Sequence, residues 1–189
     1  YDLPVLFLFT LALALMAARQ WTAYLLVFGL AALNKETAVL LLGAFVLLFF
    51  RDEALERKKF STLAGAQVVL YAVIWLATRL AFRANPGGLV EFHLADNLAM
   101  LANPAIVIVL GLFAALAAGL VFAGWRAKPH FLKVSLWMAA PLLVLMVFFG
   151  LLIEIRVLYE VYAVIFLLSA HTVLAFIGRV TRRPLLTIR

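Results

Sequence analysis

The segment Trp21–Phe50 reads WTAYLLVFGLAALNKETAVLLLGAFVLLFF, and its only charged residues, Lys35 and Glu36, lie near its middle. A helix that spans a bilayer needs about 20 apolar residues. The segment is therefore either two short helices that turn at the polar tetrad Asn34–Thr37, or one long tilted helix. The single helix would place both charges deep in hydrocarbon, where each costs about 2.5–3.5 kcal/mol. We favour the two short helices, which together form a tight hairpin.

The remainder of the chain is also strongly apolar. Of its 189 residues, 68% are hydrophobic and 13% are charged, whereas soluble domains have about 45–50% apolar and about 25% charged residues. A soluble core of this size cannot cover so much apolar surface, and the exposed remainder would aggregate. The composition predicts an all-α fold, a polytopic transmembrane helical bundle in which lipid solvates the outer faces of the helices.

The apolar runs predict about six spans within a single helical domain, residues 1–189. The runs are 3–18, the hairpin of 20–33 and 36–50, 61–82, 104–123, 134–153 and 157–177. No basic leader precedes the first run, which therefore does not resemble a signal peptide. We expect the chain to belong to a longer protein with further spans upstream. The absence of cysteine excludes disulfides and thiol catalysis.

One long polar connection, 83–103, separates two of the runs. It contains the sequence Asn85–Gly88, NPGG, which is a strong turn signal. Leucines then recur at roughly helical spacing among charged and polar residues. This pattern predicts a short amphipathic helix near 89–101 that lies on the outer surface of the membrane.

The charges of the loops predict an orientation. When the loops are numbered alternately from an outside start, the inside set holds twelve of the sixteen Lys and Arg residues and three acids, a net charge of +9. The outside set holds six acids and four cations, a net charge of −2. Because cytoplasmic loops are enriched in Lys and Arg, we expect an outside N-terminus and a cytoplasmic C-terminus in a bacterial inner membrane. The four outside cations are Lys35, Arg79, Arg83 and Arg156.

The basic residues of the inside loops have a plain interpretation. Clusters such as Arg57–Lys59 and Arg182–Arg183 lie at helix ends, where they can meet anionic headgroups. Membrane lipids are therefore expected partners. Nucleic acid is not, although the net charge of the chain is +7.

The polar residues of the predicted outer side have no such orientation role. Lys35 and Glu36 form either a turn of solvated charges or a site at which Lys35 meets a phosphate. Arg79 and Arg83 either extend from a helix end towards water or bind a ligand. Outer arginines run against the orientation bias, which favours a functional role for them.

The last span carries a second set of polar residues. Arg156 and Glu160 are four residues apart and share a helix face. Glu160 lies about one turn inside the membrane, so it needs a partner or a wet cavity. The pair either joins helices as an internal ion pair or supports an arginine that binds an anionic headgroup. His93 is either an ordinary surface histidine or a ligand contact, and His171, near Thr172, is expected to form a hydrogen bond between helices.

Cations and carboxylates at the outer membrane edge suit a lipid-linked phosphate with a polar head. Lys35, Arg79, Arg83, His93 and Arg156 are the candidate phosphate or substrate contacts, together with Glu160. Arginine and lysine bind phosphate through charge-assisted hydrogen bonds, and a carboxylate can act as a base toward an acceptor hydroxyl. The sequence has no metal-ligand spacing, phosphate loop or nucleophile elbow, and no cofactor is expected.

The first fifty residues resemble membrane glycosyltransferases of the GT-C type, which include the protein mannosyltransferases and the aminoarabinose transferases. The residues that carry the resemblance are Asp2, Pro4, Arg19 and Gly29–Glu36, GLAALNKE. The resemblance covers about a quarter of the chain. It implies a polyprenyl-phosphate sugar as substrate and an active site at the extracytoplasmic face.

The same resemblance bears on catalysis. It makes Asp2 an auxiliary carboxylate at the edge of the site and Glu36 a second candidate catalytic carboxylate. The family's main catalytic carboxylate lies in the first external loop, and no residue of this chain corresponds to it. The resemblance therefore implies that this region lies upstream of Tyr1.

Three functions remain open at this point. The chain is part of a glycosyltransferase-like enzyme, a non-catalytic subunit packed against other membrane subunits, or a lipid or solute transporter. Convergence of at least four of the candidate residues on one cavity near Asp2 would favour the enzyme, whereas scattered or self-paired residues would favour the subunit. A polar path from Glu160 inward to His171 would favour the transporter.

Overall fold

The computed structural model describes residues 2–85 and 91–181. Every regular element in these residues is a helix, so the all-α prediction is confirmed. The α-helices are α1 (Asp2–Ala17), α2 (Trp21–Asn34), α3 (Val39–Phe49), α4 (Arg57–Ala81), α5 (Leu94–Leu101), α6 (Pro104–Phe122), α7 (His130–Ser135), α8 (Ala139–Phe149) and α9 (Tyr162–Thr181). Four 3-10 turns join them, namely η1 (Glu36–Ala38), η2 (Trp125–Ala127), η3 (Leu136–Met138) and η4 (Ile155–Leu158).

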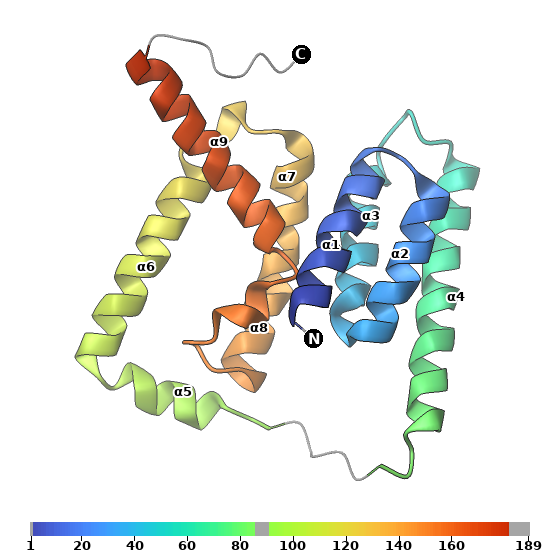
Figure 1. Cartoon of the computed structure of the whole chain (residues 1–189), viewed down its shortest axis with the longest axis horizontal. Coiled ribbons are helices and arrows are strands. Elements are labelled where there is room, and N and C mark those ends of the chain that lie inside the picture. The colour runs from blue at the N-terminus through green and yellow to red at the C-terminus, as the bar shows by residue number, and fades with distance from the viewer. Residues whose placement is uncertain (1, 86–90, 182–189) are drawn as a thin grey trace.

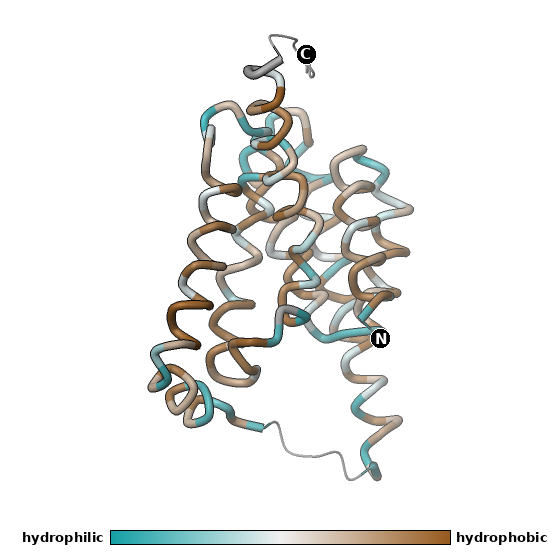
Figure 2. The backbone as a smooth tube through the Cα atoms, turned by 60° about the vertical axis from the view of Figure 1, so that its left-hand side comes forward, coloured by the Kyte–Doolittle hydropathy of each residue, from teal (hydrophilic) through white to brown (hydrophobic). Residues whose placement is uncertain are grey.

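Successive apolar helices run in opposite directions, as Figure 1 shows. One end of the fold, here the η1 end, holds the N-terminus of α1, η1, α5 and η4. The other, the η2 end, holds the α1–α2 turn, the α3–α4 loop and η2. The hydrophilic backbone positions in Figure 2 lie mainly in these connections, while the helices are mainly hydrophobic.

Most of the buried hydrophobic side chains belong to the N-terminal helices. Phe9 of α1, Tyr24 and Phe28 of α2 and Phe45 of α3 are all at most 1% exposed. Tyr24 also donates a hydrogen bond to the buried Gln67 of α4, at 2.7 Å. The core therefore lies mainly between α1, α2, α3 and α4, where the Tyr24–Gln67 hydrogen bond joins α2 to α4, and it continues into the C-terminal helices.

Within the described residues, three helices are long and apolar enough to cross a membrane: Arg57–Ala81, Pro104–Phe122 and His130–Phe149. The last of these is the continuous run of α7, η3 and α8. Four further apolar helices in the same residues are shorter. The described residues thus contain three helices that could span a membrane, and the count of about six spans stays a prediction.

Several helix ends differ from the expected ones for local reasons. The run expected at 134–153 begins at His130 and ends at Phe149, because Gly150 is extended, with φ −129° and ψ 175°. A Cβ on Gly150 would lie 3.3 Å from a Val157 methyl group and 3.4 Å from Met146, so the following chain packs closely on this glycine. The last helix begins at Tyr162 rather than at 157.

The amphipathic helix expected near 89–101 is α5, Leu94–Leu101. Residues 89 and 90 of that expectation lie outside the described residues, and 91–93 are not helical. The NPGG turn likewise extends beyond the described part of the chain, after Asn85.

Candidate functional site

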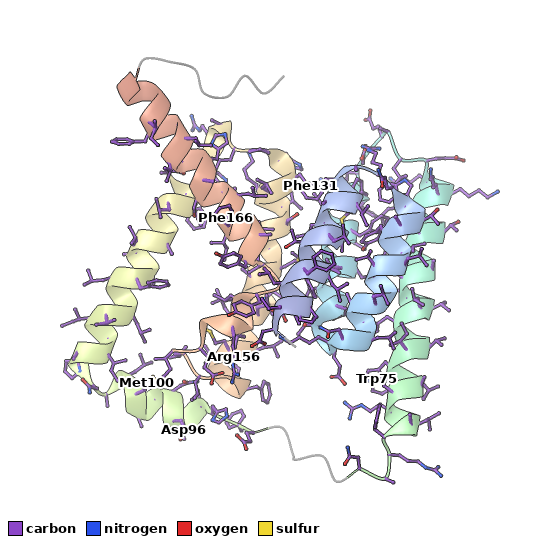
Figure 3. All side chains as sticks on the ribbon, viewed as in Figure 1. Trp75, Asp96, Met100, Phe131, Arg156 and Phe166 are labelled. Atoms are coloured by element: carbon purple, nitrogen blue, oxygen red, sulfur yellow. The ribbon has the colours of Figure 1, made fainter. Side chains whose placement is uncertain are left out.

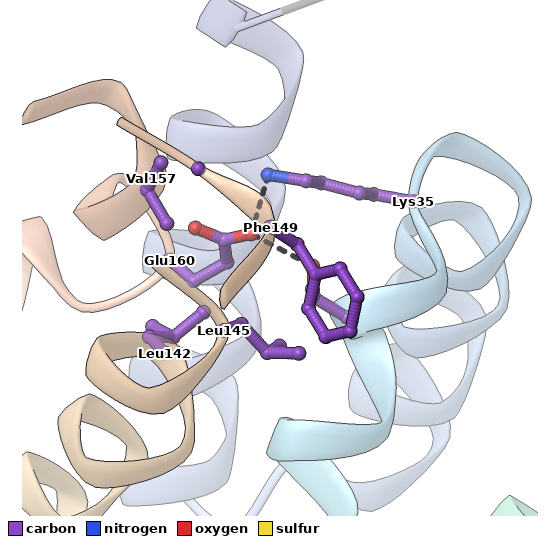
Figure 4. Close-up of a pocket in the computed structure, with 8 residues that line it drawn as sticks. Lys35, Leu142, Leu145, Phe149, Val157 and Glu160 are labelled. Carbon is purple, nitrogen blue, oxygen red and sulfur yellow. Dashed lines mark hydrogen bonds and ion pairs between the residues drawn. The ribbon is translucent and has the colours of Figure 1, made fainter. Parts of the chain in front are cut away.

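A partly open pocket of about 420 Å³ lies at the η1 end of the fold. Its walls come from η1, from α8 and from the segment between α8 and α9, as Figure 4 shows. The lining residues are Lys35, Thr37, Leu142, Leu145, Phe149, Gly150, Val157 and Glu160. The pocket is thus an apolar cavity with one polar corner.

The polar corner is built on the backbone turn between α2 and η1. Lys35 is extended, with φ −156° and ψ 136°, so the chain leaves α2 there and turns its side chain away from the helix axis. The Lys35 ammonium lies 2.6 Å from Glu160 Oε1, and the Thr37 hydroxyl donates a hydrogen bond of 2.7 Å to the same oxygen. Two neighbouring residues of the hairpin therefore bind one carboxylate from the start of the last helix.

This ion pair is unequally buried. The Lys35 side chain is 27% exposed, whereas the Glu160 side chain is fully buried. Removing one partner of a buried pair leaves an uncompensated charge, which destabilises a fold strongly. The pair accordingly joins the α2–η1 corner to the segment just before α9, and the lysine is its more exposed member.

The second carboxylate oxygen of Glu160 is unusual. Oε2 is buried, and among the described residues it has no hydrogen-bond partner. It points away from Lys35, on the side of Val157 (Figure 4). A buried acceptor without a donor costs about 1–3 kcal/mol, and more when it is charged.

The other residues of the hairpin turn face a different part of the fold. Glu36 pairs with Arg79 of α4 at 3.1 Å, and both side chains are more than 60% exposed. Tyr71 donates a hydrogen bond to the Glu36 carbonyl, and the Arg79 guanidinium lies over the Trp75 ring. Exposed pairs of this kind contribute about 0–1 kcal/mol. Glu36 and Arg79 therefore join η1 to α4 and do not line the pocket.

The remaining candidate contacts lie around the same end. Arg156 donates two hydrogen bonds to Glu154, each of 3.1 Å. Figure 3 shows Arg156 and Asp96 on the opposite flank of the fold from Trp75, the neighbour of Arg79. Arg83 is exposed beyond the end of α4 and Asp2 is half-buried at the start of α1, and neither lines the pocket.

His93 lies beside two carboxylates on the approach to α5. Its Nδ1 is 2.9 Å from Asp96, and its Nε2 is 3.3 Å from Glu91. The hydrogen bond with Asp96 is the main cause that raises the pKa of His93 above its usual 6.5, and nearby acids add to the effect. Its backbone N–H donates to the Phe148 carbonyl, so His93 joins α5 to α8.

Of the eight candidate site residues, two line the pocket, namely Lys35 and Glu160. The convergence of four residues that would have favoured an enzyme is not found. The structure brings together a lysine, a threonine and a buried carboxylate. Of the other candidates, Glu36 pairs with Arg79, while His93 and Arg156 pair with acids near them in the sequence.

Sequence reasoning missed one residue that shapes the pocket. Asn97 of α5 is 1% exposed and donates hydrogen bonds to the carbonyls of Val147 and Gly150, at 2.9 and 2.8 Å. Its Oδ1 accepts a hydrogen bond from Leu152 N–H at 3.0 Å. The signal was present, since Asn97 lies three residues after Leu94 and four before Leu101, on the apolar face of the helix.

Within the described residues, no group of three His, Cys, Asp or Glu side chains could hold a metal ion. Comparison with known proteins gives no family model, curated protein or solved structure that matches the chain. The chemistry of the site therefore has to be argued from its own geometry.

Proposed function

We propose that this chain binds the phosphate of a lipid-linked sugar carrier at the extracytoplasmic face of a bacterial inner membrane, as the carrier-binding part of a glycosyltransferase-like protein. One observation carries the proposal: the partly exposed side chain of Lys35 lines an apolar pocket. This is the arrangement that an amphiphile with an anionic head requires.

The dimensions and the donors of the pocket agree with this ligand class. Small-molecule sites are clefts of about 300–1,000 Å³ with mainly apolar walls and few polar groups, and this one has about 420 Å³. A lysine ammonium has three N–H donors. Lys35 can therefore bind a phosphate oxygen while it keeps its bond to Glu160.

The proposal concerns binding of the carrier, and the geometry gives less support to sugar transfer. A transfer reaction needs a carboxylate beside the acceptor hydroxyl. Neither Asp2 nor Glu36 lines the pocket, and Glu36 is engaged by Arg79. Catalysis by these two carboxylates remains a prediction from the family resemblance.

The test compares two lysines at opposite ends of the fold. We expect Lys35→Gln, in protein that keeps its native helical circular dichroism, to weaken the binding of a polyprenyl phosphate in nanodiscs by about tenfold, because one charge-assisted hydrogen bond is lost. The check on folding is needed because the variant leaves Glu160 uncompensated. Lys59→Gln removes an exposed lysine at the η2 end and should leave the affinity unchanged. Equal affinities of both variants and the wild type would contradict the proposal.

A second candidate, the non-catalytic subunit, is favoured by a different observation. Arg79 and Arg156 pair with carboxylates of this same chain. In addition, only 6% of the most apolar 18-residue stretch of α6 is buried, which leaves its surface available to a partner. A photo-crosslinking residue at position 112, in place of the exposed Leu112, should then give a discrete protein adduct in native membranes. Adducts with lipid alone would count against this candidate.

The geometry does not favour a transporter. Val164 and Leu168 follow Glu160 at intervals of four residues, and both are buried hydrophobic residues at 1% and 0% exposure. They fill the space through which a polar path toward His171 would pass.

A further inference from the structure

We infer that the buried end of the Lys35 pocket recognises a neutral hydroxyl group of an amphiphile, and that Glu160 Oε2 is the acceptor. The inference deepens the proposed function and rests on it for the kind of ligand, a prenyl chain with a polar head. It adds the chemistry of a second subsite, which does not bind phosphate.

The two oxygens of Glu160 have different surroundings. Oε1 accepts from both the Lys35 ammonium, at 2.6 Å, and the Thr37 hydroxyl, at 2.7 Å. Oε2 is buried and has no partner among the described residues. Since buried polar atoms in folded proteins are nearly always hydrogen-bonded, this oxygen marks the place where a donor from outside the chain belongs.

The charge of the corner selects the type of donor. Lys35 already neutralises Glu160, so an incoming ammonium would find no net negative charge to compensate its own desolvation. A phosphate at this depth would face the carboxylate and be repelled. A hydroxyl supplies one donor without a charge, and it therefore fits better than either ion.

The walls of the subsite define the rest of the ligand. Leu142, Leu145, Phe149 and Val157 line the pocket beside Glu160, so the hydroxyl must be attached to an apolar chain or ring. Val157 is half-buried and lies on the side of Oε2, and a ligand reaches the oxygen by displacing this side chain. The ligand class is a lipid alcohol, or a lipid whose head carries a free hydroxyl.

Three prenyl compounds with the same chain separate the two subsites: farnesyl phosphate, farnesol and farnesyl methyl ether. Their affinities for the full chain in nanodiscs are measured by displacement of a fluorescent prenyl probe. We expect farnesol to bind about tenfold more tightly than its methyl ether, because the ether oxygen cannot donate a hydrogen bond to the carboxylate. Equal affinities of farnesol and the ether overturn the inference, since a bound water would then suffice for Oε2.

Variants of the ion pair test whether Glu160 causes the preference for farnesol over its methyl ether. The double variant Lys35→Met with Glu160→Leu replaces the pair by apolar side chains and leaves no unpaired buried charge, and in it the preference for farnesol should disappear. Thr37→Val removes a donor to Oε1 only, and it should keep the preference. A folded double variant, with native helical circular dichroism, that still prefers farnesol overturns the inference.

The same experiment distinguishes this inference from the proposed function. Loss of farnesyl phosphate binding on Lys35→Gln, together with equal binding of farnesol and its ether, supports the phosphate site and overturns the hydroxyl subsite. The reverse result supports the hydroxyl subsite and contradicts the phosphate site. The comparison of farnesol and ether on the wild type needs no variant, so it remains decisive if the double variant does not fold.

Discussion

Single polar residues hold the C-terminal helices together, and Lys128 is the clearest case. It is 3% exposed, and its ammonium donates to the carbonyls of Leu120, Val121 and Leu168. Thr172 donates to the Leu120 carbonyl as well. Carbonyls at the end of a helix lack partners and carry partial negative charge. Lys128 thus caps α6 with a cation and ties it to α9, while burial lowers the pKa of the lysine.

We expect Lys128→Met to destabilise the fold by about 1–3 kcal/mol, because three carbonyls lose a charged donor and the Thr172 hydroxyl remains only for those of Leu120 and Leu168. The matched control is Arg126→Met, which removes an exposed cation from the same loop. Thermal unfolding followed by circular dichroism in detergent measures both. Equal melting temperatures of the two variants would show that the cap contributes nothing to stability.

Residue partners were the part of the site least predictable from sequence. Lys128 resembled any other basic residue of a cytoplasmic loop, because the positive φ of Gly124 that turns the loop back is not visible in the composition. Helical spacing suggested Arg156 as the partner of Glu160. The structure instead pairs Glu160 with Lys35. These residues are 125 positions apart, so no local sequence pattern could predict their contact. A hydrogen bond between helices was expected of His171, and Thr172 makes one.

At the scale of elements, α5 packs against the end of α8 that lines the pocket and holds it through hydrogen bonds. Asn97 binds the carbonyls of Val147 and Gly150, and the Phe92 ring packs against Phe149 at 5.8 Å. Phe149 and Gly150 are pocket residues. The position of one pocket wall therefore depends on a short helix that itself lies outside the pocket.

We expect Asn97→Leu to detach α5 from α8 and to raise amide exchange in residues 94–101 and 150–152 about tenfold or more, since three buried hydrogen bonds are lost. Leu98→Ala changes an exposed neighbour and should leave the exchange unchanged. Hydrogen–deuterium exchange with mass spectrometry measures the effect. Slow exchange of both segments in the Asn97 variant would mean that other contacts fix the wall.

The N-terminal helices could be predicted as elements because each coincides with a continuous apolar run of the sequence. The expected runs 3–18, 20–33 and 36–50 differ by at most one residue at each end from α1, from α2 and from the continuous stretch Glu36–Phe49. The later ends were less predictable, since they depend on tertiary contacts such as the close packing of Val157 on Gly150. The packing of α6 on α9 rather than on α8 also lies beyond any periodic pattern.

At the scale of the whole molecule, the distribution of charge between the two ends agrees with the alternating directions of the helices. The connections at the η2 end include Arg19, Arg51 and Arg126, while η1, α5 and η4 lie at the other end with most of the acids. Large exposed hydrophobic side chains such as Val69 and Leu112 cover the flanks between the two ends. A lipid environment around the flanks accounts for this surface. The enrichment of cytoplasmic loops in Lys and Arg then predicts that the η1 end is extracytoplasmic.

The absence of cysteine makes this orientation directly testable. Arg83→Cys and Arg51→Cys place single thiols at exposed positions of opposite ends. In intact spheroplasts, an impermeant maleimide should label the thiol at position 83 and should label the thiol at position 51 only after permeabilisation. The reverse pattern would invert the proposed orientation and remove the pocket from the outer face.

The helices of this fold differ greatly in length. α1 has 16 residues and α2 has 14, so they measure about 24 and 21 Å at 1.5 Å per residue, whereas α4 has 25 and measures about 38 Å. The hydrocarbon layer of a bilayer is about 30 Å thick. If α1 and α2 span the bilayer as we predict, local thinning beside their exposed residues, such as Phe7 and Leu26, would match the membrane to them at a fraction of a kcal/mol per Å of mismatch. With the predicted orientation, such thinning would lower the outer headgroup plane toward Lys35 and would direct the protein to the thinner regions of a membrane.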